Sequence, residues 1–434
     1  MLGQIGLPGG GFGLNYRYST DGLDLNSGVR MGMINAGKPN PAMPFFPVAR
    51  IADALLKPNQ PFEYNGQMLH YPNIKLVYWA GGNPFAHHPD TNYLVKAWQQ
   101  PETVIVNECF WTPTARMADI VLPATTSYER NDVTVSGDYV VKNIIPMKQV
   151  VPPQFEAKND YDIFAELAKR AGKEAEFTEN KSEMDWLKEF YQIGFEAGQK
   201  AGTPFPTFEE FWAKNSVLAF KAEGENGNNF VRYQDYRTDP ITHKLATPSG
   251  KIEIFSETVA KMGYDDCKGH PTWFEHQEYS GKTTAAEPLA LVTPHIKYRL
   301  HSQLAYSSLR QYYEVNGREP LLIHTQDAAE RGITSGDIVR IFNKRGQVLA
   351  GAVVTEGIIQ GTVALYEGGW YDPQDLGSDS PLCKNGNPNV LTRNEGSSKL
   401  GQGNAPNTTT VQVEKFEGEA LKVTVFEEPV FSRC

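Results

Sequence analysis

The sequence has few cysteines, no long apolar run and no concentration of positive charge. Only four of its 434 residues are cysteine, and none has the CxxC spacing of an iron–sulfur or zinc site. Its apolar runs fall well short of the roughly 20 residues that a membrane-spanning helix needs. The net charge is −10, without a basic stripe, so we expect neither a membrane span nor a nucleic-acid partner.

The common catalytic signatures are also missing. The nine histidines form no HxH and no HExxH pattern, which argues against a zinc protease. The glycine-rich stretch at residues 8–13 lacks the Lys-Ser/Thr that completes a phosphate loop, and we interpret it as a tight turn. Because no nucleophile–base arrangement can be recognised, the sequence predicts no catalytic side chain and no protein ligand to a metal ion.

The residues that are present are typical of a loop-rich α/β protein. Hydrophobic residues make up 40% of the chain and charged residues 21%, with 39 glycines and 29 prolines. This is the composition of a globular protein, and the length suggests two or three domains. The chain begins like the middle of a helix that runs into a glycine turn, without a signal peptide. We therefore expect the natural polypeptide to continue upstream.

Apolar runs followed by polar turns predict a parallel sheet in the first part of the chain. Residues 75–80, 102–106 and 119–123 have the length and composition of buried strands. Residues 91–99 and 161–170 have helical spacing. Strands that alternate with helices favour a parallel, Rossmann-like sheet.

The character of the sequence changes towards the C-terminus. Residues 173–285 are rich in charge and aromatic side chains, and we interpret them as a connecting region with helical patches. Beyond residue 285, short strand-like runs separated by turn residues predict a β-barrel. These runs are residues 289–292, 320–324, 338–342, 347–354 and 362–366. The predicted domains are therefore residues 1–172, 173–285 and 286–434.

Polar residues follow the predicted strands at the edge where open α/β sheets bind ligands. Asn83 lies in a Gly-Asn-Pro turn after the first strand, with His87 close behind. Asn107 and Glu108 end the second strand, where a carboxylate can accept hydrogen bonds from a ribose or a guanine. A plain structural role, in a turn, a helix cap or a loop ion pair, is the alternative interpretation at both positions.

Two further places carry polar side chains that could bind a ligand. Arg130 follows the third run and could bind a phosphate through its guanidinium, although an ion pair on a loop is the simpler interpretation. Arg299, His301 and Gln303 come just after a predicted strand. On a continuing strand these three side chains would share one face, which suggests a ligand more than solvent.

Taken in order, these segments resemble the dimethyl sulfoxide reductase family of molybdenum enzymes. The resemblance is strongest to the branch that reduces trimethylamine N-oxide, dimethyl sulfoxide and biotin sulfoxide, and it runs along nearly the whole chain. It rests on LGQIGLPGGGFG at residues 2–13, GGNPFAHH at 81–88, WTPTARMADIVLPATTSYERND at 111–132, NDYDIF at 159–164, TPSGKIEIFS at 247–256, YRLHSQL at 298–304, EGGWYDP at 367–373 and GNPNVLT at 386–392. It implies an α/β fold, with a parallel-sheet, Rossmann-like molybdopterin-binding region followed by a six-stranded, double-psi-type β-barrel domain.

The resemblance also implies which residues contact the cofactor, a molybdenum ion held by two molybdopterin guanine dinucleotides. In the α/β region the matching positions are Asn83, His87, Asn107, Glu108, Arg130 and Asp160. In the barrel region they are Thr293, Pro294, His295, Ile296, Arg299, His301, Ser302, Gln303, Asn389, Gln402, Pro406 and Asn407. The serine that ligates molybdenum in this branch belongs to an N-terminal half with no counterpart here. The resemblance therefore implies a chain that is roughly the second half of the enzyme.

The family chemistry is oxygen-atom transfer, in which two electrons and two protons restore the reduced cofactor and release water. The resemblance thus implies a reductase of N-oxides or S-oxides, including methionine sulfoxide, that works in anaerobic respiration with the missing N-terminal half and a c-type cytochrome as electron donor. It implies a periplasmic location, with the cytoplasm as the alternative. A non-catalytic fragment or relic is the second hypothesis, and formate dehydrogenase and nitrate reductase are weaker ones. The reading frame upstream of Met1 distinguishes an enzyme from a relic.

Overall fold

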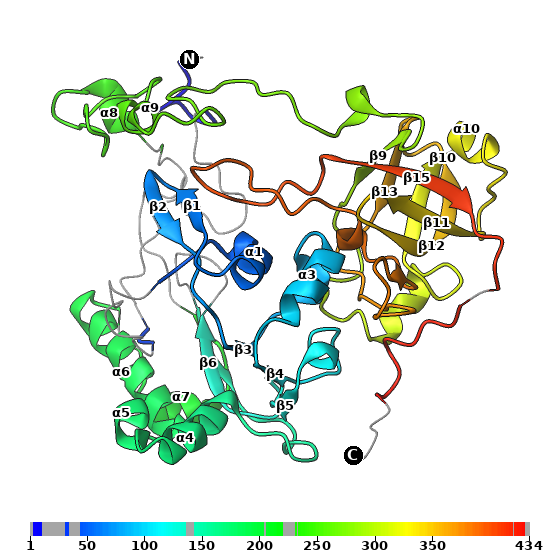
Figure 1. Cartoon of the computed structure of the whole chain (residues 1–434). Coiled ribbons are helices and arrows are strands. Elements are labelled where there is room, and N and C mark those ends of the chain that lie inside the picture. The colour runs from blue at the N-terminus through cyan, green and yellow to red at the C-terminus, as the bar shows by residue number, and fades with distance from the viewer. Residues whose placement is uncertain are drawn as a thin grey trace. The chain divides into compact units, whose positions relative to one another are not determined.

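A computed structural model describes residues 3–10, 31–33, 44–135, 143–203, 205–219, 231, 233–419 and 421–429. The chain divides into two compact units (Figure 1). Unit 1 comprises Met1–Asn40 and Pro123–Ser256, and unit 2 comprises Pro41–Leu122 and Glu257–Cys434. Within the described residues, no helix combines the length and the apolar character needed to cross a membrane.

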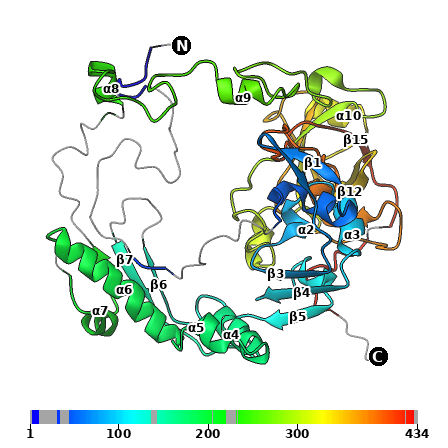
Figure 2. The same cartoon turned by 60° about the vertical axis from the view of Figure 1, so that its left-hand side comes forward.

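Unit 2 contains the predicted three-stranded sheet, formed by β3 (Leu76–Ala80), β4 (Thr103–Glu108) and β5 (Ile120–Pro123) (Figure 2). Strands β3 and β4 run parallel, with Val77 opposite Val104 and Trp79 opposite Val106. Helix α3 (Thr91–Trp98) connects them and begins where the Asp90 carboxylate accepts a hydrogen bond from the Tyr93 amide. The predicted βαβ arrangement is confirmed.

The C-terminal strands of unit 2 close into a six-stranded barrel, as predicted. Its strands follow one another around the barrel in the order β10, β13, β9, β15, β11 and β12, and β12 pairs with β10 to close it. Strand β10 runs parallel to β12 and β9 runs parallel to β13, while the other four pairings are antiparallel. The bounds are β9 (Leu289–Val292), β10 (Pro320–His324), β11 (Ile338–Asn343), β12 (Gly346–Thr355), β13 (Thr362–Leu365), β14 (Leu382–Cys383, beside β12) and β15 (Thr409–Lys415).

The sheet and the barrel share one hydrophobic core. Fully buried Leu94 and Val106 from the sheet region belong to the same packed cluster as Leu291 and Ile341 from the barrel. Burial of side chains of this size stabilises the fold by about 1.5–3 kcal/mol each. Loops at the end of the sheet are therefore held in a fixed position relative to loops of the barrel.

Shorter elements complete unit 2. A hairpin joins β1 (Pro61–Tyr64) to β2 (Gln67–His70) through Asn65 and Gly66, both with positive φ (47° and 77°), as a tight hairpin turn requires. The remaining elements are η1 (Val48–Arg50), α1 (Ile51–Leu56), α2 (Pro84–His87), η2 (Ala115–Met117), α9 (Glu257–Lys261), η3 (Ser280–Lys282), η4 (Ser308–Tyr312), α10 (Thr325–Ala329) and η5 (Pro388–Val390).

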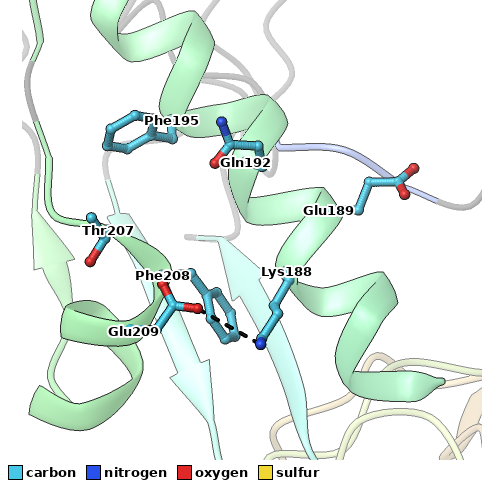
Figure 3. Close-up of a pocket in the computed structure, with 7 residues that line it drawn as sticks. All are labelled: Lys188, Glu189, Gln192, Phe195, Thr207, Phe208 and Glu209. Atoms are coloured by element: carbon cyan, nitrogen blue, oxygen red, sulfur yellow. Dashed lines mark ion pairs between the residues drawn. The ribbon is translucent and has the colours of Figure 1, made fainter. Parts of the chain in front are cut away.

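Unit 1 is a helical layer beside a small antiparallel sheet. Its elements are β6 (Asp132–Val135), β7 (Asn143–Met147), α4 (Asp160–Arg170), α5 (Glu174–Thr178), α6 (Glu183–Lys200), α7 (Phe208–Lys214), β8 (Leu218–Ala219) and α8 (Gln234–Thr238). Helices α6 and α7 both begin with capping boxes, at Ser182 and Thr207. An open pocket of about 390 Å³ lies between them, with Lys188 reaching towards Glu209 at 3.7 Å (Figure 3).

One sequence expectation on the first residues is wrong. Residues 3–10 form turns rather than the end of a helix, with positive φ at Gly3, Gly6 and Gly9. Three glycines in left-handed conformations within seven residues are incompatible with a continuous right-handed helix. Residues 11–13 of the predicted glycine turn lie outside the described residues.

Candidate functional site

The first polar loop follows β3 and depends on two glycines. Gly81 and Gly82 have φ values of 78° and 93°, which side-chain-bearing residues rarely adopt. A Cβ atom on Gly82 would lie 3.3 Å from Nε1 of Trp79, so the glycine keeps this turn open beside the indole. Nε1 of Trp79 is buried without a hydrogen-bond acceptor among the described residues. The loop therefore offers an unused donor next to backbone that a ligand can approach closely.

Asn83 is held in this loop by groups from elsewhere in unit 2. Its side chain is buried, and its Oδ1 accepts a hydrogen bond from the Thr114 hydroxyl at 2.7 Å. Its Nδ2 lies 3.5 Å from the Ser302 hydroxyl of the barrel region. Asn83 and Ser302, for both of which the resemblance implies cofactor contacts, thus lie side by side although they are 219 positions apart.

Two histidines follow Asn83 and differ in their surroundings. The pKa of His87 is lowered, first because the surrounding protein disfavours the charged ring and then by His301, whereas Glu367 raises it. Burial, reinforced by His87 and Arg50, lowers the pKa of His88 to about 3. His88 is therefore neutral at physiological pH.

The second polar loop ends β4. Asn107 is buried, and its Oδ1 accepts a hydrogen bond from the Tyr78 hydroxyl at 2.8 Å. Glu108 is half-buried and accepts from the Thr112 hydroxyl at 3.1 Å and from the Cys109 amide at 2.8 Å. Its carboxylate is therefore oriented by its own loop.

A carboxylate joins two of the proposed histidines in the barrel region. Glu367 contacts Nδ1 of His295 through Oε1 at 2.7 Å and Nδ1 of His301 through Oε2 at 3.3 Å. The two imidazole centroids lie 5.1 Å apart. Glu367 was not among the predicted site residues, although the EGGWYDP motif that begins with it was part of the resemblance.

Arg299 lies beneath these histidines, with its side chain only 1% exposed. Its Nη2 donates to Glu319 at 3.1 Å and to the Glu367 carbonyl at 2.8 Å, and its Nε donates to the His301 carbonyl at 3.0 Å. Burial raises the pKa of Glu319 to about 7, although the charge and hydrogen bond of Arg299 act to lower it. Arg299 therefore holds the loop in place from inside and does not present its guanidinium on the surface.

The expectation that Arg299, His301 and Gln303 share one face of a strand is wrong. The segment forms turns, with φ of 50° at His301 and a hydrogen bond from the Gln303 amide to the Leu300 carbonyl. Arg299 is buried by its pairing with Glu319, whereas His301 and Gln303 are exposed. The buried ion pair and the left-handed residue override the alternation of a strand.

Other predicted residues of the barrel region brace its loops. Asn407 accepts hydrogen bonds from the amide (2.7 Å) and the hydroxyl (3.1 Å) of Thr293. The Pro294 carbonyl accepts from the Glu367 amide at 3.1 Å, and the Pro406 carbonyl accepts from the Thr409 hydroxyl at 3.1 Å. These hydrogen bonds hold Asn407 beside Thr293, two residues before His295 in the sequence.

Three predicted residues of unit 2 have mainly structural contacts. Ile296 is buried. Asn389 is buried and donates from Nδ2 to the Ala86 carbonyl at 3.0 Å, which fixes the loop after β3. Gln402 donates to the Glu63 carbonyl at 2.8 Å and thereby holds the β1–β2 hairpin.

Two predicted residues lie in unit 1. Arg130 forms an ion pair with Asp132, the first residue of β6. Asp160 is the first residue of α4, where Asn159 caps the helix and a negative charge is favoured. The loop ion pair that the sequence analysis gave as the simpler interpretation of Arg130 is therefore present.

The arrangement in unit 2 fits a flat, hydrogen-bonding ring system such as a pterin. The unused donor of Trp79, the amide of Asn83 and the cluster of His295, His301 and Glu367 offer both donors and acceptors. Sequence reasoning missed Trp79, Glu319 and Glu367, because the role of each depends on long-range packing. The two glycines that directly follow Glu367 in the EGGWYDP motif, Gly368 and Gly369, are the sequence signal that could have indicated Glu367.

The sequence of this chain matches two protein-family models. Residues 1–170 match the family described as molybdopterin oxidoreductase, and residues 289–410 match the family described as molydopterin dinucleotide binding domain. The parallel sheet and the closed barrel lie largely within these two matches. The chain belongs to the molybdopterin oxidoreductase family.

Within this family the chain is similar to reductases of two small oxides. It is 62% identical over 440 residues to a trimethylamine-N-oxide reductase of Haemophilus influenzae, covering 99% of this chain and 53% of that protein. It is 50% identical over 438 residues to a dimethyl sulfoxide/trimethylamine N-oxide reductase of Cereibacter sphaeroides, again covering 99% and 53%. The chain therefore spans about half the length of the curated relatives it matches.

A solved structure supports the fold. Acetylene hydratase from Pelobacter acetylenicus superposes with a TM-score of 0.59 and 23% sequence identity, covering 80% of this chain and 45% of that one. At this identity the likeness establishes the shared architecture of sheet and barrel and nothing about the reaction.

Proposed function

We propose that this chain supplies a pterin-dinucleotide-binding surface of a molybdenum-dependent reductase of N-oxides or S-oxides. The observation that carries the proposal is the 62% identity to a trimethylamine-N-oxide reductase along 99% of the chain. The geometry supports it, because the polar loops after β3 and β4 lie in the same unit as the histidine loop of the barrel.

The residues of unit 2 act by binding and orienting the cofactor. Asn83, Ser302 and the two histidines His295 and His301 hydrogen-bond its ring systems, and Asn107 with Glu108 accepts from guanine or ribose. Bound in this way, a bis(molybdopterin guanine dinucleotide) molybdenum cofactor supplies oxygen-atom transfer. Arg299 acts through its neighbours and is a positioning residue.

The substrate proposed first is trimethylamine N-oxide, with dimethyl sulfoxide second, in the order in which the similar proteins are named. We further propose a periplasmic location, anaerobic respiration, and electron delivery from a c-type cytochrome. Molybdenum binding then requires the part of the relatives' length that this chain does not match. The division at residues 172 and 285 remains a prediction.

Reconstitution tests this function. The chain is co-produced in a molybdenum-replete host with the segment of the Haemophilus influenzae relative that it does not match. Trimethylamine N-oxide and dimethyl sulfoxide are then tested as oxidants of reduced benzyl viologen, and bound pterin is measured by fluorescence after oxidation. We expect pterin and activity in the complex and activity in neither part alone. A soluble complex without pterin would refute the proposal.

A further inference from the structure

Residues 421–427, here called the strap, pack against two polar loops of unit 2. One hydrophobic cluster joins four buried side chains that are far apart in the sequence, Ala86, Ala305, Trp370 and Val425. The first of these lies three residues after Asn83, and the second lies three residues after Ser302. The side chains of Asn83 and Ser302 lie 3.5 Å apart. The strap therefore packs where these two loops meet.

Buried polar groups anchor the strap to unit 2. The Asp372 carboxylate accepts hydrogen bonds from the amide (2.7 Å) and the hydroxyl (3.0 Å) of Thr424. Lys384 donates to the same hydroxyl at 2.8 Å, and its side chain and that of Asp372 are only 7% and 5% exposed. Arg318 and Arg116 donate to the first and the last carbonyl of the strap. Charged groups thus hold the strap in its middle and at both ends.

Trp370 connects the strap to the backbone of Ser302. The buried indole ring stacks on Phe426 of the strap, with ring centroids 5.3 Å apart. Its Nε1 donates to the Ser302 carbonyl at 3.1 Å. The Arg310 guanidinium lies 3.5 Å from the centroid of the Phe426 ring, a cation–π contact that holds this ring in turn. The position of the strap is therefore transmitted through the indole to Ser302.

The segment before Trp370 packs on the same loop. Gly368 has a φ of 83°, and a Cβ atom on it would lie 2.1 Å from the carbonyl oxygen of His301 and 2.9 Å from the amide nitrogen of Ser302. The two backbones are therefore in direct contact. The conformation of the Ser302 loop thus depends on residues 368–370 as well as on Arg299, which donates to the His301 carbonyl.

We propose that Trp370, held by the strap, is a positioning residue that keeps the Ser302 loop against the Asn83 loop and so prepares both for the cofactor. Loops that are fixed before binding lose less conformational entropy when a ligand binds. Trp370 acts through the Ser302 carbonyl and not by contact with the cofactor. The link to the cofactor rests on the proposed function, whereas the effect on the two loops does not.

Hydrogen exchange of the full, cofactor-free chain tests the effect on the loops. Trp370→Phe keeps an aromatic ring on Phe426 but removes the indole donor, and Phe426→Leu removes the aromatic stack. In both variants the amides of residues 301–305 and 85–87 should exchange roughly 2–10-fold faster. This is the change that the loss of one uncharged hydrogen bond or one aromatic pair produces in a local opening equilibrium.

Trp186→Phe is the matched control for Trp370→Phe. Trp186, in α6 of unit 1, is also buried, and its Nε1 donates to the Tyr161 hydroxyl at the same distance of 3.1 Å. Exchange in the two loops should be unchanged in this variant. Unchanged exchange in Trp370→Phe and Phe426→Leu would overturn the proposal, as would an equal increase in Trp186→Phe. If Trp370→Phe fails to fold, Phe426→Leu decides, since Phe426 is only partly buried.

Release of pterin from the reconstituted complex tests the link to the cofactor. After dilution, the fluorescence of released pterin should rise roughly 2–10-fold faster with Trp370→Phe than with the unmodified chain or with Trp186→Phe. Equal release rates in all three complexes would show that Trp370 positions no cofactor contact. An unmodified complex without pterin would instead refute the proposed function, and hydrogen exchange would still decide whether the strap holds the two loops.

Discussion

Charged residues are used differently in the barrel of unit 2 and in the helical layer of unit 1. In the barrel region, Arg299 and Glu319 pair with side chains only 1% and 2% exposed. In the helical layer, Lys173 and Glu176 pair with side chains 60% and 71% exposed, three residues apart on the chain. A buried pair is costly to break, whereas a surface pair contributes little.

The difference indicates what each region's charges do. Pairs of the barrel region join distant segments, such as Glu278 before β9 and Arg345 in the β11–β12 turn. They hold loops in position, including the loop of His301. Pairs of the helical layer are mostly local and lie in water, so they favour solubility and helix ends more than a particular tertiary arrangement.

Removing one partner of a buried pair should have the largest effect. Glu319→Ala leaves the Arg299 guanidinium without its carboxylate, and loss of one partner of a buried pair costs about 3–5 kcal/mol. Glu166→Ala in α4, whose carboxylate contacts Lys158 and Arg170 at the surface, should leave stability unchanged. Urea unfolding of both variants measures the contrast. Equal stabilities would show that the buried pair is no more important than an exposed one.

A comparison of two leucines tests packing in the same way. Leu349 in β12 is fully buried, and Leu349→Ala should reduce the free energy of unfolding by about 2–5 kcal/mol because it leaves a cavity. Leu167 in α4 is 39% exposed, and Leu167→Ala should change it by no more than about 0.5 kcal/mol. Thermal melting of the two variants checks this, and a larger loss in the helical variant would contradict the comparison.

Most of the fold could be predicted from the sequence. The strands of the sheet and five of the six barrel strands are short apolar runs between turn residues, and each lies within two residues of its predicted bounds. The sixth barrel strand, β15, was not among the predicted runs. Their pairing could not be derived from these patterns. Closure of the barrel depends on β10 meeting β12 in parallel, a contact between strands that are not adjacent in sequence.

The candidate site was less predictable. Strand-end polarity indicated Asn83 and Asn107, because parallel strands end at one edge of the sheet. Strand alternation wrongly placed Arg299 on one face with His301 and Gln303, since the orientation of Arg299 depends on Glu319, twenty residues away. A carboxylate that is fully buried has no pattern in the sequence to distinguish it from an exposed one.

Acid should weaken the barrel through Glu278. Burial raises the pKa of this carboxyl, but hydrogen bonds and charge from Arg345 and Lys344 outweigh burial and lower it from 4.5 to about 2. A lowered carboxyl pKa stabilises the folded state above the unfolded pKa, and this contribution is lost as the pH falls through the folded one. Glu278→Gln should therefore melt below the unmodified chain at pH 7, and the gap should close between about pH 4.5 and 2. Glu209→Gln, an exposed residue of α7, should melt like the unmodified chain throughout. A gap for Glu278→Gln that stays constant to pH 2 would contradict this assignment.

Replacing Arg130, which lies in unit 1, should have the smallest effect on stability of these substitutions. Its ion pair with Asp132 is about 30% exposed, so its loss should cost the chain at most about 1 kcal/mol. If Arg130 also binds a cofactor phosphate, Arg130→Ala removes a charged hydrogen bond worth about 1.5–3 kcal/mol, roughly a ten- to hundred-fold loss of affinity. We therefore expect less molybdenum per reconstituted complex, with near-normal turnover per bound molybdenum. Arg130→Lys should recover only part of it, because an ammonium lacks the guanidinium fork.

Asp132→Asn separates the two roles of Arg130. This variant removes the same ion pair but leaves the guanidinium free to bind phosphate. Molybdenum content should therefore stay at the unmodified level in Asp132→Asn and fall in Arg130→Ala, while the cofactor-free chains melt at nearly the same temperature. Equal lowering of the melting temperature by both variants, with full molybdenum content in each, would assign Arg130 to the loop alone. At this position unit 1 would then contribute an exposed, local ion pair and no phosphate contact, unlike the buried ion pairs that hold the loops of the barrel region.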